Sequence, residues 1–176
     1  MEVTTDLTIG STRVLIAPLP AATQGQKRAD REREATAALL SYALGHPAAI
    51  THAPNGAPRL AGADSSWHIS VSHSRTRVAV ALNPVRRIGI DVEEWRDQLV
   101  NVKNKFVQSG EEAEWGSRLL EAWMAKEAAY KAFEPVDSIT VLSIRIAGST
   151  ASYGNSLARL HFGEGFVLAE DYSLMP

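Results

Sequence analysis

The chain contains no cysteine among its 176 residues. This absence excludes disulfide bonds, thiolate metal sites and a cysteine nucleophile, and it is consistent with a reducing cytoplasm. Long apolar runs are absent as well: the stretch from Val14 to Leu19 is too short for a signal sequence or a bilayer span, and Pro18 and Pro20 interrupt it. We therefore expect a cytoplasmic protein with no membrane partner.

A large excess of charge of one sign is also missing, because 18 lysines and arginines stand against 20 aspartates and glutamates. A dedicated nucleic-acid-binding protein is usually basic, so the net charge of -2 argues against nucleic acid as the partner. Hydrophobic residues make up 45% of the chain and charged residues 22%, which is ordinary for a globular protein long enough to bury a core.

The hydrophobic pattern predicts the same order of elements twice: a strand, then helix, then several strands. In the first half, residues 1–86, the predicted elements are a strand, a helix and three further strands, at 12–17, 23–44, 49–52, 67–72 and 77–82. Gly45 and Pro47 follow the helix as stop signals, and the composition of residues 54–58 predicts a turn.

In the second half, residues 87–176, the predicted elements are a strand, two helical segments and three further strands, at 88–92, 99–106, 110–133, 138–146, 152–162 and 166–170. Ser109 and Glu112 have the spacing of a capping box at the start of the longer helix. The repeated order predicts an α+β fold of two similar halves that join near Pro84–Arg87.

Two acidic residues mark the predicted strand 88–92 and its end. Asp91 and Glu93 lie two residues apart, so alternation along the strand puts both carboxylates on one face. Two adjacent anions repel each other, and a cation between them relieves the repulsion. Mg²⁺ typically binds one or two carboxylates together with substrate phosphates and water. The alternative is a strand that runs out into a charged, solvated loop, because Glu94 follows directly.

The predicted helix 110–133 carries a second candidate site. Leu120, Trp123, Glu127 and Lys131 recur at helical spacing, and because the first two are apolar, Glu127 lies at the end of a core-facing stripe. A half-buried carboxylate needs a partner, which a metal ion would provide. Lys131 is then placed to reach a phosphate on that ion. The alternative is an exposed Glu127–Lys131 pair that only supports the helix.

Serines alternate along the segment His68–Ser74. Ser70, Ser72 and Ser74 would share one face of a strand, whereas His73 points to the other face or leaves the strand at the loop. Hydroxyl groups and an imidazole at a strand end can bind phosphate oxygens. The alternative is a polar strand edge with a satisfied histidine.

Two other kinds of site have less support. A Ser–His–Asp hydrolase built from Ser72 or Ser74, His73 and Asp91 lacks the G-x-S-x-G elbow, and neighbours in sequence seldom have triad geometry. A zinc site is also disfavoured, because none of the five histidines has H-x₃-H spacing.

Taken in order, four motifs resemble the phosphopantetheinyl transferase superfamily, specifically its surfactin-synthetase-activating type. They are N-G-A-P at 55–58, S-V-S-H-S at 70–74, I-G-I-D-V-E at 88–93 and W-M-A-K-E-A-A-Y-K at 123–131. Each motif alone is short, whereas all four in this order and spacing form a specific pattern. The resemblance extends from Arg28 to Phe133.

The resemblance implies a pseudo-twofold α+β fold with coenzyme A bound in the cleft between the halves. It also implies Mg²⁺-dependent transfer of 4′-phosphopantetheine from coenzyme A to a serine of an acyl or peptidyl carrier protein, which converts the apo carrier to the holo form. By motif match, Asp91, Glu93 and Glu127 would hold the Mg²⁺, and a monomer would supply the complete site. A relative that only binds coenzyme A or a carrier is the alternative, but the complete carboxylate set favours catalysis.

The resemblance further assigns the contacts of coenzyme A. By motif match, the residues that bind it would be Gly56, Ala57, Pro58, Ser72, His73, Lys126 and Lys131. The Gly56–Pro58 loop would border the adenine, and His73 and Lys131 would contact phosphates. Glu127, directly or through a metal-bound water, would take the proton of the carrier serine.

Two departures from the family pattern concern basic residues. The loop usually reads Gly-Lys-Pro, where this chain has Ala57, and an arginine usually stands near Ala37 on the first helix. In the family both groups lie near the adenosine end of coenzyme A. Arg33, one turn before Ala37, is the expected replacement, and the alternatives are Lys27, Arg28 and Arg31.

Overall fold

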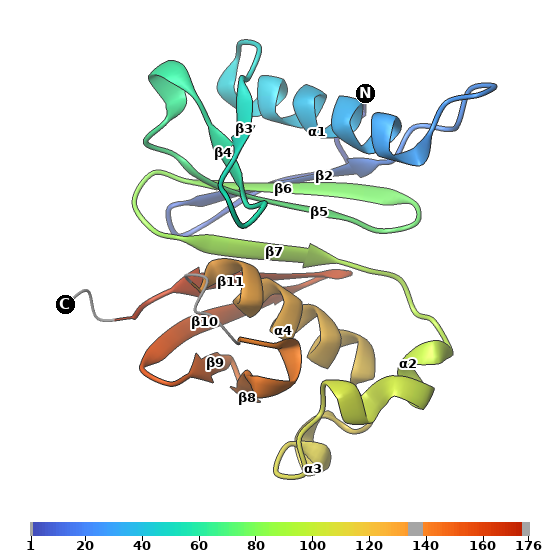
Figure 1. The fold of residues 1–176 in the computed structure, drawn as a ribbon, viewed down its shortest axis with the longest axis vertical. Coiled ribbons are helices and arrows are strands. Elements are labelled where there is room, and N and C mark those ends of the chain that lie inside the picture. Colours follow the sequence, from blue (N-terminus) through green and yellow to red (C-terminus); the bar gives the residue numbers. More distant parts are fainter. Residues whose placement is uncertain (1, 134–138, 174–176) are drawn as a thin grey trace. The chain divides into compact units, whose positions relative to one another are not determined.

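The computed structural model describes residues 2–133 and 139–173 of the chain (Figure 1). These residues form a mixed α/β structure with antiparallel sheets, four α-helices and three short 3₁₀ helices. The chain divides into two compact units, Met1–Val85 and Arg86–Pro176. No helix in the described ranges is long and apolar enough to cross a membrane.

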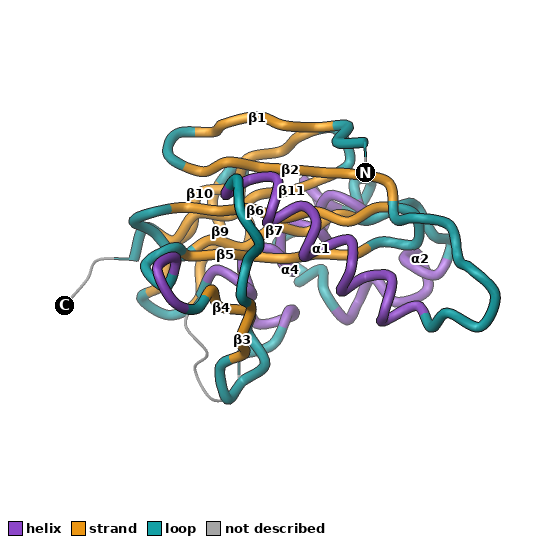
Figure 2. Tube along the Cα trace, turned by 90° about the horizontal axis from the view of Figure 1, so that it is seen from above, coloured by secondary structure: helices purple, strands orange, loops and turns teal. Residues whose placement is uncertain are grey.

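The first unit contains a four-stranded antiparallel sheet in the order β1-β2-β6-β5. Its strands are β1 (Thr5–Ile9), β2 (Thr12–Pro18), β5 (His68–His73) and β6 (Arg77–Asn83). Figure 2 shows β1 beside β2 at the edge of this sheet. The remaining elements are the hairpin strands β3 (Ile50–His52) and β4 (Pro58–Leu60) and the 3₁₀ helix η1 (Gly62–Asp64).

Helix α1 (Arg28–Leu44) covers one face of this sheet and packs against β2 and β6 (Figure 1). Leu15 of β2 and Val80 of β6 meet Leu39 and Leu40 of the helix in the core of the unit, where all four are fully buried. Because side chains alternate along a strand, every second residue of β2 and β6 belongs to the surface on which α1 rests.

The second unit contains a five-stranded antiparallel sheet in the order β7-β11-β10-β9-β8. Its strands are β7 (Ile88–Val92), β8 (Arg145–Ala147), β9 (Thr150–Tyr153), β10 (Ser156–Gly163) and β11 (Phe166–Asp171). The helices are α2 (Gln98–Val102), η2 (Lys103–Lys105), α3 (Glu112–Trp115), α4 (Leu119–Ala132) and η3 (Val141–Ser143). Helix α4 packs against β7 and β11 and contributes alanines to the core.

Six predicted strands are confirmed within one or two residues. Those at 12–17, 49–52, 67–72, 77–82, 88–92 and 166–170 are β2, β3, β5, β6, β7 and β11. The predicted end of the first helix is also confirmed, because Gly45 adopts the left-handed conformation (φ 77°) and donates to the carbonyl oxygen of Ser41. Strand β1 was not predicted, since its only apolar residues are Leu7 and Ile9.

Two glycine turns change the predicted bounds of other elements. The first helix was expected over 23–44 but begins at Arg28, because Gly25 (φ 78°) lies in a turn that α-helical backbone cannot continue. The strand expected over 152–162 is the hairpin β9–β10, and Gly154 (φ 56°) lies in the turn between its strands.

The prediction of one continuous helix over 110–133 is wrong, because the structure divides this segment into α3 and α4. Gly116 weakens the helix after α3. The backbone of Arg118 (φ -119°, ψ 45°) is not helical. The capping box predicted at Ser109 is also wrong. The residue that precedes α3 is Glu111, and its side chain makes no capping hydrogen bond.

The strand predicted over 138–146 is largely wrong. Ser138 lies outside the described residues, η3 follows, and only β8 is extended. Thr140 and Ser143 form a capping box that favours the 3₁₀ turn, because the N–H of Ser143 donates to Thr140 Oγ1 (3.2 Å). Local side-chain hydrogen bonds thus replace the extended conformation that the apolar pattern indicated.

Candidate active site

Strand β7 and helix α4 are in direct backbone contact at Gly89. A Cβ atom at this position would lie 1.9 Å from the carbonyl oxygen of Ala128 and 2.8 Å from the amide nitrogen of Ala132. Both alanines are fully buried. These small residues let the helix approach the strand closely enough for a lysine of α4 to reach the last residues of β7.

Gly89→Ala should therefore destabilise the protein strongly, because the added methyl group would meet helix backbone rather than a movable side chain. We expect a loss of about 1–3 kcal/mol or more in the free energy of unfolding, measured by urea denaturation. Gly110→Ala is the matched control: its Cβ would meet only Arg145 Nη1, at 3.8 Å, so its stability should change by about 0.5 kcal/mol at most. A Gly89→Ala protein as stable as the control would contradict this packing.

Lys131, in the last turn of α4, connects the helix to the strand. Its Nζ donates to Asp91 Oδ1 (2.7 Å) and to the carbonyl oxygen of Ile90 (2.9 Å). The side chain of Asp91 is 9% exposed and that of Lys131 is 27% exposed. The strand motif and the helix motif therefore meet at this ion pair, and Lys131 retains enough exposure to contact a second anion.

Glu127 lies one turn before Lys131 and is half-buried. Burial raises the pKa of its carboxyl group above the usual value, the nearby Asp91 carboxylate raises this pKa further, and the Lys131 ammonium opposes both. Within the described part of the chain, the Glu127 carboxylate makes no hydrogen bond or ion pair. A half-buried carboxylate beside a second carboxylate is thus left for a cation or a proton donor to satisfy.

Glu93 follows the last residue of β7 and accepts hydrogen bonds from residues of the loop after the strand. One of its carboxylate oxygens accepts from the N–H of Glu94 (3.0 Å), and the other accepts from Arg96 Nη2. Over residues 2–133 and 139–173, no group of three or more His, Cys, Asp and Glu side chains is placed to hold a metal ion. Of the three expected carboxylates, Asp91 lies near enough to Glu127 to raise its pKa, and Glu93 pairs with Arg96.

The oxygen ligands where β7 meets α4 still suit a hard divalent cation. Asp91 and Glu127 offer carboxylate oxygens, which are the ligands that Mg²⁺ prefers in proteins. Burial and then the Asp91 carboxylate raise the pKa of Glu127, and Lys131 opposes both only in part, so the charged form of Glu127 is disfavoured here. A divalent cation at these oxygens would favour the ionised form of Glu127 and so reduce that cost.

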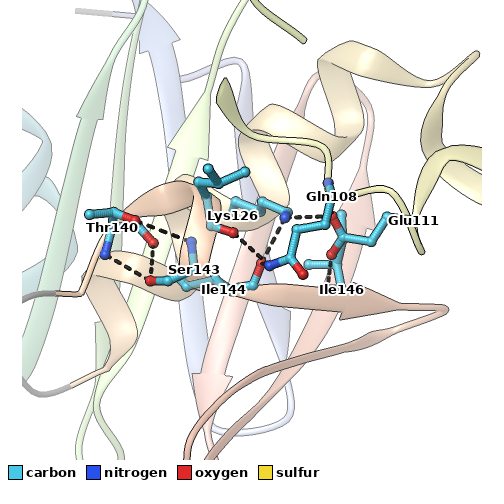
Figure 3. A network of polar contacts seen from close by, with 8 residues as sticks. Gln108, Glu111, Lys126, Thr140, Ser143, Ile144 and Ile146 are labelled. Atoms are coloured by element: carbon cyan, nitrogen blue, oxygen red, sulfur yellow. Dashed lines mark hydrogen bonds and ion pairs between the residues drawn. The ribbon is translucent and has the colours of Figure 1, made fainter. Parts of the chain in front are cut away.

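Lys126 is fully buried and takes part in a network of structural contacts (Figure 3). Its Nζ donates to Glu111 Oε2 (2.6 Å) and to the carbonyl oxygen of Ile144 (2.7 Å). Glu111 in turn accepts from the backbone N–H groups of Ile146 (2.7 Å) and Gln108 (2.8 Å). Burial lowers the pKa of Lys126, although Glu111 opposes the shift. Lys126 thereby ties α4 to the residue before β8 and to the segment before α3, and it presents no exposed surface to a ligand.

His73, the last residue of β5, faces helix α1. Its Nε2 lies 2.8 Å from the hydroxyl oxygen of Thr36. Because side chains alternate along a strand, Ser72 points to the face of the sheet opposite α1, where it is buried. Ser74 is also buried, and its Oγ accepts from the backbone N–H of Arg77 (3.0 Å), which orders the turn between β5 and β6.

The loop between β3 and β4 is an exposed turn. Gly56 has φ 85°, a backbone conformation that favours glycine, and its N–H donates to the carbonyl oxygen of Ala53 (2.8 Å). The N–H of Ala57 donates to Asn55 Oδ1 (3.2 Å). Gly56 and Ala57 are exposed, whereas Pro58 is half-buried at the start of β4. The loop therefore offers backbone rather than charged side chains to a ligand.

The basic residues of α1 differ in what they contact. Arg33, the expected replacement for the missing family arginine, has a side chain that is 78% exposed and pairs with Asp30. Arg28 donates from Nη2 to the carbonyl oxygen of Ser74 (2.9 Å) and from Nε to Glu32 (2.6 Å). Arg28 thus ties the start of α1 to the end of β5.

Two residues of this site region were not singled out by the sequence analysis. Glu111 lies 15 residues before Lys126, outside the spacing at which helical residues meet, so no local pattern identifies it. Gly89 did carry a signal, since an isolated glycine inside a strand of branched apolar residues marks a bulge or a close backbone approach.

Comparison with protein-family models and with curated proteins gave no match to this chain.

Proposed function

We propose that the protein transfers the 4′-phosphopantetheine arm of coenzyme A, with Mg²⁺, to a serine of an acyl or peptidyl carrier protein. The observation that supports this most directly is the contact of β7 with α4. This contact involves Asp91, Glu127 and Lys131. By the family resemblance, Asp91 and Glu127 would hold the metal, Glu127 would take the serine proton, and Lys131 would contact a phosphate.

In the proposed reaction, the oxygen of the carrier serine attacks the β-phosphorus of coenzyme A. The bond from that phosphorus to the bridging oxygen breaks, and adenosine 3′,5′-bisphosphate leaves. The serine proton passes to the carboxylate of Glu127, whose raised pKa makes it a stronger base than an ordinary glutamate. Lys131, one turn along the helix and partly exposed, donates to the diphosphate and stabilises the charge that develops on the leaving group.

Asp91 and Glu127 would hold the Mg²⁺, and Glu93 would join them by exchanging its bond to Arg96 for the ion. When bound, Mg²⁺ supplies positive charge that neutralises the diphosphate. An ion held there would also favour the charged form of Glu127, which burial and the Asp91 carboxylate disfavour.

The proposal extends to the arrangement of the substrate. The two units would be the halves of a pseudo-twofold fold with coenzyme A in the cleft between them. The Gly56–Pro58 loop and His73 would lie on the adenosine side, and the contact of β7 with α4 on the diphosphate side. Because one chain would supply the complete site, we expect a monomer. We also expect the protein to act in the cytoplasm.

Mass spectrometry of an apo carrier protein, incubated with this protein, coenzyme A and Mg²⁺, tests the proposal. We expect each carrier chain to gain the mass of one phosphopantetheine group, and we expect no gain in excess EDTA, because the diphosphate charge would then lack its cation. The assay should include carriers of the fatty-acid, polyketide and peptide types. Binding of coenzyme A with no mass gain on any carrier would support a non-catalytic relative instead, and full transfer in excess EDTA would contradict the role of Mg²⁺.

A further inference from the structure

Two of the three carboxylates expected to hold a metal ion are paired with cations of the chain itself. Lys131 donates to Asp91, and Arg96 pairs with Glu93 in the loop between β7 and α2 (Figure 1). The third carboxylate, that of Glu127, has its pKa raised by burial and by Asp91. A divalent cation that binds all three carboxylates must therefore compete with these two partners.

Glu93 has both of its carboxylate oxygens engaged. Oε1 accepts from the backbone N–H of Glu94 (3.0 Å), and Oε2 accepts from Arg96 Nη2. The side chain of Glu93 is 15% exposed, whereas that of Arg96 is 51% exposed. A hydrogen bond between a guanidinium and a carboxylate is charge-assisted and about twice as strong as a neutral one. A largely buried anion is thus held by a cation that remains in contact with solvent.

Arg96 is the partner that can release its carboxylate. Its carbonyl oxygen accepts from the N–H of Leu99 (2.9 Å), which is buried in the core at the start of α2. The backbone of Arg96 is therefore anchored, and its long side chain can rotate into solvent without moving the loop. Lys131 is less free, because it is 27% exposed and also donates to the strand carbonyl of Ile90.

We propose that Arg96 is a positioning residue that holds Glu93 as an internal counter-ion and thereby sets the affinity for the divalent cation. This inference rests on the proposed function, which brings such a cation to Glu93 together with Asp91 and Glu127. The ion has to displace Arg96 from Glu93, so the free energy of that pair opposes metal binding. Removing Arg96 therefore tightens metal binding, whereas removing a residue that orients Glu93 as a ligand would weaken it.

Binding of Mn²⁺ to the whole chain, followed by the loss of the free-ion signal in electron paramagnetic resonance, tests this without coenzyme A or a carrier. Mn²⁺ takes the same carboxylate and water ligands as Mg²⁺. Arg96→Gln should bind Mn²⁺ roughly three- to ten-fold more tightly than the wild type, because a partly exposed charge-assisted pair no longer competes.

Lys105→Gln is the matched control, because it removes one positive charge from the same unit. Lys105 is exposed, and no ion pair to its ammonium is present in residues 2–133 and 139–173. Its replacement should leave the affinity for Mn²⁺ within about two-fold at physiological salt, since exposed charges more than a Debye length apart are largely screened. The control separates release of Glu93 from a general change in net charge.

A double-variant cycle identifies Glu93 as the group that Arg96 holds. In a Glu93→Gln background, Arg96→Gln should change the affinity for Mn²⁺ by at most about two-fold, because no carboxylate remains to be released. Circular dichroism checks that Arg96→Gln is folded. If it is not, Arg96→Lys is the second variant, and it should show a smaller gain, because lysine keeps the charge but lacks the planar set of donors.

Equal affinity of the wild type and Arg96→Gln would overturn the inference, as would an equal gain in Lys105→Gln or the same gain without Glu93. Weaker binding by Arg96→Gln, or no Mn²⁺ binding by any of these proteins, would overturn it as well. The outcome is separable from the proposed function. A gain that depends on Glu93, with no transfer to any carrier, keeps this role of Arg96 and removes the transferase. Mg²⁺-dependent transfer by a protein whose metal affinity is insensitive to Arg96 does the reverse.

Discussion

Replacing Glu127 with glutamine should lower the rate of phosphopantetheine transfer by at least about 100-fold, since a positioned general base contributes roughly 10²–10⁴-fold to a reaction. Glutamine keeps the size of the side chain but cannot accept the serine proton or hold a cation through a charged oxygen. The rate should be measured under single-turnover conditions, with carrier modification followed by mass.

Glu121→Gln is the matched control for this prediction. Glu121 lies on the same helix and pairs with Arg118 at the surface, where both side chains are more than a third exposed. Its replacement should leave the transfer rate within about two-fold, because surface ion pairs contribute little. A Glu127→Gln protein that transfers at the rate of the Glu121→Gln protein would remove Glu127 from the reaction.

Stability provides an independent check on the Glu127 variant. The folded state raises the pKa of Glu127, so above its unfolded pKa the ionised carboxylate reduces the free energy of unfolding. As the pH falls through the folded pKa, the carboxyl group becomes protonated and this loss disappears. Glu127→Gln should therefore be at least as stable as the wild type at neutral pH, and its advantage should shrink in acid. Urea denaturation of both proteins at neutral and at acidic pH measures this difference in the free energy of unfolding.

The second large effect is expected from Lys126→Met, which should reduce the free energy of unfolding by about 3–5 kcal/mol, because it leaves one charge of a buried pair uncompensated. Lys126 and Glu111 have 0% and 4% of their side-chain surface exposed. The remaining Glu111 carboxylate would keep its backbone N–H donors but lose its cation. Urea denaturation measures the change.

Lys103→Met is the control, because it removes an ion pair of the same chemistry at the surface. Lys103 lies 2.6 Å from Glu112, with side chains 45% and 50% exposed. This variant should lose at most about 1 kcal/mol. The double variant Glu111→Leu, Lys126→Met should recover much of the stability, since no buried charge remains. The double variant should also keep its affinity for coenzyme A if the role of Lys126 is structural. A loss of this affinity in a folded double variant would indicate that Lys126 contacts the ligand.

Local physical chemistry explains which features the sequence determined. Strands such as β6 and β7 follow from short runs of branched apolar residues between turn signals, because extended backbone and period-two burial are properties of a few consecutive residues. Gly45 ends α1 for an equally local reason, since its left-handed backbone stops the helix. The half-burial of Glu127 also follows from helical spacing alone.

Tertiary structure decided the features that depend on residues far apart in the chain. The partnership of Lys126 with Glu111, 15 residues apart, reflects packing that helical periodicity does not contain. The pairing of Glu93 with Arg96 depends on the conformation of the loop after β7, which a strand pattern does not predict once the strand has ended.

The basic residues of α1 illustrate the same division. From the sequence, Arg31 and Arg33 are equivalent guanidinium groups two positions apart. Helix geometry points them in different directions. The fold gives Arg33 a carboxylate and solvent, whereas it buries the Nε of Arg31 without a hydrogen-bond partner among the described residues. The cost of an unpaired charge depends on its burial, and burial is a property of the folded chain. The residue types are therefore written in the sequence, whereas the burial and the partners of each arginine are decided by the tertiary structure.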